Sequence, residues 1–134
     1  MLVETGLITP LYVAISGLIF VVLSIRTLRL RHRFKVGIGS GNDPVLARAI
    51  RVHGNFAEYV PTALLLLLFV EISAGSIALV HALGLLLLAG RLLHAYGVSH
   101  VDENYKFRIV GMTMTFAAII SSALLLLAGY IPSG

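Results

Sequence analysis

Polar side chains recur on one face of an otherwise apolar segment in the first half of the chain. This polar stripe consists of Arg48, Arg51, Asn55, Glu58, Tyr59 and Thr62. At about 100° per residue of an α-helix these positions fall within an arc of about 100°, so a helix places them on a single face. Glu58 stands shortly before the apolar residues 63–70. A charge at such a depth in a membrane costs several kcal/mol unless it is paired or lines a wet cavity.

A second set of polar side chains lies in two later segments. Arg91 and His94 are three residues apart and so share a helix face, and Lys106 and Arg108 begin the next apolar segment. All four are expected to lie toward the same membrane side as the polar stripe. Together the two sets predict a cationic cavity.

Such a cavity suits an anionic or zwitterionic small molecule. Arginines recognise carboxylates, the amide of Asn55 can bind another amide, and Glu58 can bind an ammonium group. The alternative is that Arg51, Asn55 and Glu58 form only a network of hydrogen bonds and ion pairs that fixes helix packing. Composition alone does not name the ligand.

Several classes of chemistry are excluded or disfavoured by what the chain contains. It has no cysteine, so a disulfide, a cysteine zinc ligand and a protein thiol nucleophile are excluded, and any sulfur chemistry must arrive with a small molecule. The five histidines show no ligand spacing, and no metal site is predicted. The net charge of +4 does not indicate nucleic-acid binding, because the ten cations lie between or at the ends of apolar runs.

The elements that must position these residues are membrane-spanning helices. Of the 134 residues, 58% are hydrophobic and 12% are charged, against about 25% charged residues in an ordinary soluble domain. We predict one integral membrane domain, residues 1–134, with four helices at about 7–30, 44–72, 77–97 and 105–130. Each reaches the roughly 20 residues that cross a bilayer core. The expected fold is all-α, a four-transmembrane-helix antiparallel bundle.

The loops give the bundle an expected orientation. Asp43 and Pro44 are suited to begin the second helix as its cap and first residue. The first-to-second and third-to-fourth connections share one side, and all ten cations fall on or near it. The positive-inside rule then predicts that the basic loops are cytoplasmic and that both termini lie on the opposite side. The basic end of the first helix is expected to contact anionic lipids.

Two motifs resemble a known family. Arg51-x-x-x-Asn55-x-x-Glu58-Tyr59-x-Pro61, followed by Gly90-Arg91-x-x-His94 and a basic start to the fourth helix, is similar to the membrane-associated proteins in eicosanoid and glutathione metabolism, the MAPEG family. The glycine-rich residues 37–42 and Glu71 resemble its bacterial branch. The resemblance implies a microsomal glutathione S-transferase-like protein of the bacterial inner membrane. It also implies a homotrimer that holds glutathione between adjacent subunits.

The resemblance further implies which residues act. The expected glutathione-binding residues are Arg48, Arg51, Asn55, Glu58, Tyr59, Arg91 and His94. A basic residue at the start of the fourth helix is implied to stabilise the sulfur anion. We choose Arg108 for this catalytic role, because Lys106 is expected to reach lipid headgroups.

The function implied is general rather than eicosanoid-specific. His94 and Val98 occupy positions where leukotriene-forming enzymes carry tyrosines. The resemblance therefore implies a glutathione transferase or peroxidase for detoxification, acting on a lipophilic second substrate from the bilayer. One alternative is a non-enzymatic lipid-binding or scaffold protein of the same family. Another is a small drug exporter, which is disfavoured because Glu58 has Arg51 beside it on the stripe.

Overall fold

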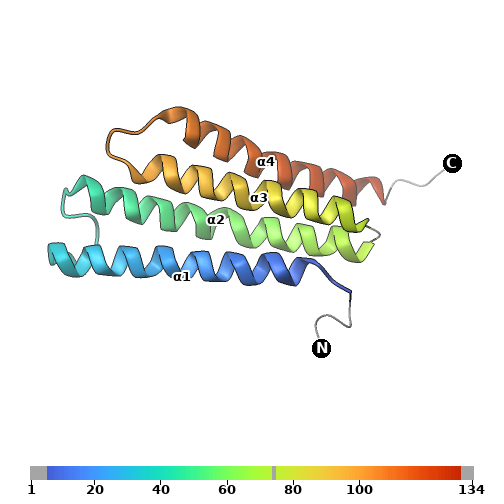
Figure 1. Cartoon of the computed structure of the whole chain (residues 1–134), viewed down its shortest axis with the longest axis horizontal. Coiled ribbons are helices and arrows are strands. Elements are labelled where there is room, and N and C mark those ends of the chain that lie inside the picture. Colours follow the sequence, from blue (N-terminus) through green and yellow to red (C-terminus); the bar gives the residue numbers. More distant parts are fainter. Residues whose placement is uncertain (1–5, 74, 131–134) are drawn as a thin grey trace.

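The computed structural model describes residues 6–73 and 75–130. Four helices follow one another, α1 (Thr9–Phe34), α2 (Pro44–Ser73), α3 (Ile77–Ser99) and α4 (Tyr105–Ala128). They lie side by side, with the α1–α2 and α3–α4 connections at one end of the molecule (Figure 1). All four helices are long and apolar enough to cross a membrane. The prediction of an all-α antiparallel bundle of four spans is confirmed.

The helix ends follow from local side-chain chemistry. Asp43 Oδ1 accepts a hydrogen bond of 2.8 Å from the N–H of Leu46, which caps α2 one residue before Pro44. Asn104 Oδ1 accepts from the N–H of Lys106 at 3.1 Å and begins α4 in the same way. The first helix continues from the expected span through the basic residues to Phe34, before Lys35 adopts the left-handed conformation (φ 56°) that ends it.

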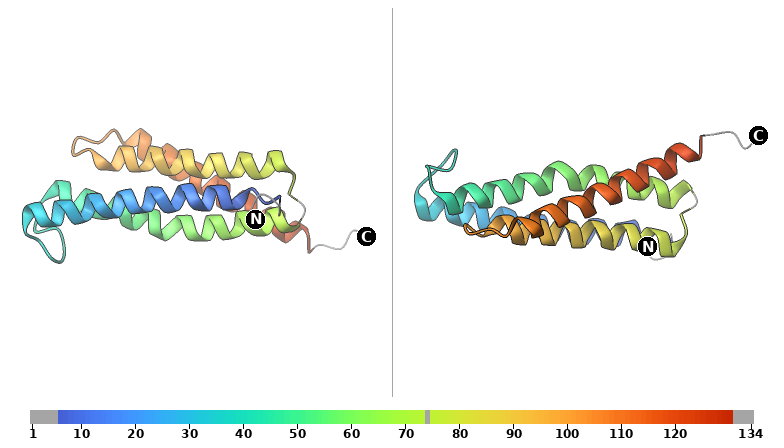
Figure 2. Two further views of the ribbon diagram at one scale, coloured as in Figure 1. Left: turned by 60° about the horizontal axis from the view of Figure 1, so that its bottom comes forward. Right: turned by 90° about the horizontal axis from the view of Figure 1, so that it is seen from above.

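Two glycines let α3 and α4 approach closely. A Cβ atom added at Gly111 would lie 2.5 Å from the backbone nitrogen of His94 and 2.6 Å from the carbonyl oxygen of Gly90. Small residues at such a crossing allow backbone contact that larger side chains would prevent. α4 runs obliquely across α3, as the second view in Figure 2 shows.

We call the end of the bundle that holds the α1–α2 and α3–α4 connections the loop end. The larger cluster of buried apolar side chains lies toward the opposite end. Its buried side chains are Tyr12, Leu67, Val70, Val80, Leu83 and Leu88. The Tyr12 hydroxyl is hydrogen-bonded to His81 Nδ1 at 2.9 Å, and the Glu71 carboxylate accepts from the backbone N–H groups of Ile8 and Thr9. Glu71 thereby caps the start of α1 from α2. At the loop end, buried apolar side chains such as Leu46, Val52 and Val98 lie beside charged and polar side chains.

Candidate functional site

The polar stripe on α2 divides between the inside of the subunit and its outer face. Asn55 is 5% exposed, whereas the side chains of Arg51 and Glu58 are 56% and 50% exposed. Arg48 is only partly exposed, and so is Tyr59. A single helix face therefore serves two environments, because neighbouring helices cover only part of its arc.

The outward part of the stripe is an ion pair. The guanidinium of Arg51 donates two hydrogen bonds to the Glu58 carboxylate, to Oε1 at 3.2 Å and to Oε2 at 3.1 Å. The two residues are seven apart, so the pair runs along two turns of α2. Glu58 is thus a paired carboxylate, which weakens the exporter alternative.

The inward part of the stripe binds a buried arginine. Arg91 of α3 is 1% exposed. Its Nη1 donates to Asn55 Oδ1 at 2.5 Å, its Nε donates to Thr115 Oγ1 at 2.8 Å, and its Nη2 lies 3.2 Å from Met112 Sδ. The guanidinium carbon also lies 5.6 Å from the centre of the Tyr59 ring. No carboxylate of the described residues forms an ion pair with Arg91, so neutral dipoles and an aromatic face stabilise its charge.

His94 lies one turn further along α3 and is 4% exposed. Its backbone packs directly against Gly111 of α4. Arg91 and His94 therefore belong to the packed junction of α2, α3 and α4. Neither Arg91 nor His94 is among the described residues that line the pocket at the loop end, which is described next.

Three arginines of the predicted set do meet in a pocket. At the end of the bundle that holds the two loops, a cavity of about 330 Å³ is lined by Pro44, Ala47, Arg48, Arg51, Val98, Glu103 and Arg108. The arginines come from the first half of α2 and from the start of α4. This loop-end pocket is where the sequence-predicted residues Arg48, Arg51 and Arg108 come together, and Lys106 is not part of its lining.

An acidic residue that sequence analysis did not assign to the site lies in this pocket. Arg48 Nη1 forms a close ion pair with Glu103 Oε2, and Arg108 Nη1 lies 3.5 Å from Glu103 Oε1. Arg48 Nη1 also donates to the carbonyl oxygen of Val98 at 3.1 Å. The hydrogen bond from Arg48 and the positive charges of Arg48 and Arg108 hold the pKa of Glu103 below its usual value.

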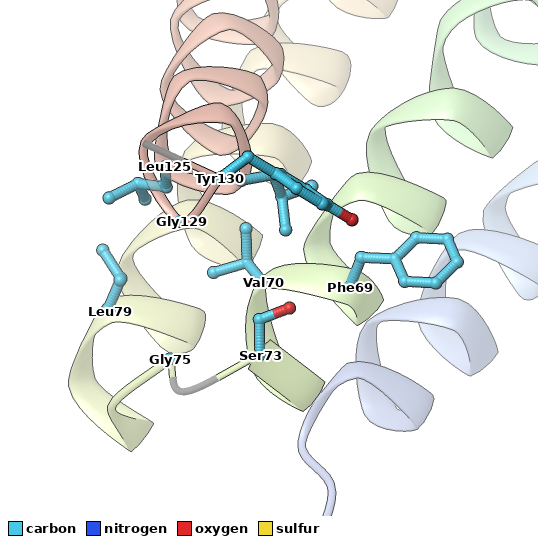
Figure 3. Close-up of a pocket in the computed structure, with 9 residues that line it drawn as sticks. Phe69, Val70, Ser73, Gly75, Leu79, Leu125, Gly129 and Tyr130 are labelled. Atoms are coloured by element: carbon cyan, nitrogen blue, oxygen red, sulfur yellow. The ribbon is translucent and has the colours of Figure 1, made fainter. Parts of the chain in front are cut away.

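A larger cavity lies at the opposite end of the bundle. Its volume is about 650 Å³, and it opens between the end of α2, the start of α3 and the end of α4. Figure 3 shows Phe69, Ser73, Leu79 and Tyr130 around it. None of the described residues that line it is charged, and its polar side chains are those of Ser73 and Tyr130, so it offers a mainly apolar surface without a cation to bind an anion. We therefore assign the candidate site to the smaller loop-end pocket.

Within residues 6–73 and 75–130, no group of three or more His, Cys, Asp or Glu side chains is placed to hold a metal ion. The remaining chemistry is that of guanidinium groups. Three of them beside a small pocket can bind carboxylates and can stabilise an anion that forms during a reaction.

Comparison with known proteins adds a family and one named relative. A model of the MAPEG family matches residues 9–128. Inner membrane protein YecN from Escherichia coli K12 is 39% identical over 114 residues, which cover 85% of this chain and 86% of YecN. YecN from Escherichia coli O6:H1 matches to the same extent. The match to the family model spans all four helices.

Proposed function

Because the chain belongs to the MAPEG family, we propose that it is a membrane enzyme that uses glutathione. It conjugates glutathione to lipophilic electrophiles, reduces lipid hydroperoxides, or does both. The observation that carries this proposal is the loop-end pocket, where Arg48, Arg51 and Arg108 surround a space of about 330 Å³. Positive charge is costly on the helices of a membrane protein, and a ligand of opposite charge would explain why these arginines lie together.

Glutathione has two carboxylates, an ammonium group and a thiol, and the residues around the pocket match these groups. Arg48 and Arg51 bind carboxylates, and Glu58 binds the ammonium group when Arg51 turns from Glu58 to the ligand. The partly exposed Tyr59 ring completes the binding surface. Asn55, Arg91 and His94 are buried in a single subunit and are not among the described residues that line the pocket. Their expected contact with glutathione stays a prediction.

Arg108 is the proposed catalytic residue. A thiol like that of cysteine has a pKa of about 8.5, so only a few per cent is ionised at neutral pH. A guanidinium within hydrogen-bonding distance favours the thiolate but cannot act as a base, so the proton leaves to solvent. The thiolate then attacks an electrophilic carbon and displaces its leaving group, or adds to it and takes up a proton from solvent. With a hydroperoxide it attacks the terminal oxygen, which gives glutathione sulfenic acid and, with a proton from solvent, the alcohol. A second glutathione then converts the sulfenic acid into the disulfide and water. Proximity and fixed positive charge supply the catalysis.

The proposal includes an assembly and a location. Arg51 and Glu58 are about half exposed on the outer face of a single subunit, and an exposed ion pair on a membrane helix is stabilised when another subunit covers it. A homotrimer that closes the site between adjacent subunits meets this need. The basic loops face the cytoplasm by the positive-inside rule, and the name of the relative YecN favours the inner membrane. The lipophilic substrate enters from the surrounding lipids.

The test is an assay of the purified protein in detergent. Glutathione binding is measured first, and turnover is then measured with chlorodinitrobenzene and with a lipid hydroperoxide. Arg51→Gln should weaken glutathione binding, whereas the matched control Arg33→Gln, at the end of α1 and outside the pocket, should leave it unchanged. Binding without turnover would replace the enzyme by a scaffold that binds glutathione, and absence of binding would end the proposal.

A further inference from the structure

In the loop between α3 and α4, one acidic side chain, that of Glu103, points toward the inside of the protein. The side chain of Glu103 is 3% exposed, whereas its neighbours Asp102 and Asn104 are exposed. Among the described residues that line the loop-end pocket, Glu103 is the one carboxylate beside three arginines. An acid of this loop thus occupies the place where the charge of the pocket would attract an anion.

The contacts of Glu103 are those of a bound anion, and they are incomplete. Its Oε2 accepts from Arg48 Nη1. Its Oε1 lies 3.5 Å from Arg108 Nη1 and has no hydrogen-bond partner among residues 6–73 and 75–130. The side chain of Arg108 is 47% exposed, so its guanidinium stays accessible to a second anion. A ligand carboxylate with better geometry at both arginines could replace this arrangement.

We infer that Glu103 is an intramolecular occupant of the anion site, which neutralises Arg48 and Arg108 in the empty pocket and gives way to a ligand carboxylate. An entering carboxylate would otherwise meet a like charge within a few ångströms, which is unfavourable. Rotation of the Glu103 side chain relieves this contact. The rotation leaves the start of α4 intact, because the cap of that helix is the next residue, Asn104.

The exchange makes the pocket selective. A neutral molecule cannot compensate Arg48 and Arg108 and so does not displace Glu103, whereas a carboxylate can. Glu103 therefore lowers the affinity of the pocket for all anions. Only an anion that also makes further contacts binds tightly enough to displace it. The inference rests on the proposed function for the identity of the natural ligand alone, since the competition applies to any carboxylate.

The experiment compares anion binding by the wild type and Glu103→Gln in detergent, by calorimetry, with glutathione and with succinate as separate probes. Glutamine keeps the size of the side chain and removes its charge. Glu103→Gln should bind both probes about tenfold more tightly, which corresponds to about 1.4 kcal/mol. Asp102→Asn, the exposed neighbouring carboxylate in the same loop, is the matched control and should bind as the wild type does.

Unchanged or weaker binding by Glu103→Gln, with an unchanged circular dichroism spectrum and elution volume, would overturn the inference and make Glu103 a structural bridge. If Glu103→Gln does not fold, Glu103→Asp replaces it. Its carboxylate is one methylene shorter and is expected to lose contact with one of the two arginines, so tighter binding is again expected and unchanged binding again overturns the inference. Tighter succinate binding without any glutathione binding would support the inference and contradict the proposed function.

Discussion

The buried guanidinium of Arg91 depends on neutral partners, and Thr115→Val removes one of them. Thr115 is 0% exposed, and its Oγ1 accepts from Arg91 Nε at 2.8 Å. Interhelical hydrogen bonds in membranes contribute about 0.6 kcal/mol on average, whereas hydrogen bonds to charged groups contribute about 1.5–3 kcal/mol. Because Arg91 is charged and 1% exposed, the second range applies. We expect Thr115→Val to lower the free energy of unfolding by about 1.5 kcal/mol or more.

Valine has nearly the shape of threonine, so the loss reports the two hydrogen bonds of the Thr115 hydroxyl, which accepts from Arg91 and donates to the carbonyl oxygen of Gly111, rather than a cavity. The assay is unfolding of the protein in mixed micelles by dodecyl sulfate, followed by far-ultraviolet circular dichroism. Thr113→Val, at an exposed position of the same helix, is the control and should change stability by less than about 0.5 kcal/mol. Equal losses in the two variants would refute the view that Arg91 depends on neutral hydrogen-bond partners inside the bundle.

Three further predictions concern packing, the ion pair and acid stability. Gly111→Ala should destabilise the bundle by about 1–3 kcal/mol, because its Cβ would lie 2.5 Å from a backbone nitrogen of α3. The control Gly17→Ala should not destabilise it, because its Cβ meets nothing within 4 Å. Equal unfolding curves for the two variants would contradict the close crossing of α3 and α4. Glu58→Gln should change the free energy of unfolding by less than about 1 kcal/mol, because the ion pair of Glu58 with Arg51 is half exposed. The same variant should weaken glutathione binding measured by calorimetry. Unchanged affinity would remove Glu58 from the site. The folded-state pKa of Glu103 lies below its unfolded value, so its charge contributes stability above about pH 4.3 that is lost as pH falls through the folded pKa. The stability difference between wild type and Glu103→Gln should therefore shrink in this acid range, and a constant difference would contradict the ion pairs of Glu103.

The four helices could be predicted from the sequence because each apolar stretch is long enough to cross a bilayer and each boundary has a local cause. Asp43 caps α2 as its position before Pro44 predicts. The expected membrane span of α1 ends at about residue 30, and the helix continues through the basic residues that follow to Phe34. It ends where Lys35 adopts φ 56°, just before the glycine-rich residues 37–42.

The candidate site was predictable only in part. The helical repeat of 100° per residue identified a polar face on α2, but it does not say which part of that face a neighbouring helix covers. The burial of Asn55 and the exposure of Arg51 depend on how α3 and α4 pack, which no spacing along one helix reveals. Thr115 and Met112, which contact Arg91, looked like ordinary residues of an apolar span.

Glu103 was missed for a different reason. A polar loop residue is normally solvated, and nothing in the loop sequence distinguishes Glu103 from Asp102. Its inward direction follows from the positions of Arg48 and Arg108, which come from two helices far apart in the chain. A useful signal would have been the excess of arginine predicted for the pocket, because such an excess favours the nearest acidic side chain as a counter-ion.

The most direct test of the proposed chemistry is the ultraviolet absorbance of the thiolate when glutathione binds at neutral pH. Wild-type protein should generate a thiolate signal, and Arg108→Ala should lose most of it together with turnover while glutathione still binds. Lys106→Ala, which removes a nearby cation outside the pocket lining, should keep the wild-type signal. An equal thiolate signal in Arg108→Ala and wild type would contradict the role of Arg108, and no signal in the wild type would contradict thiolate stabilisation altogether.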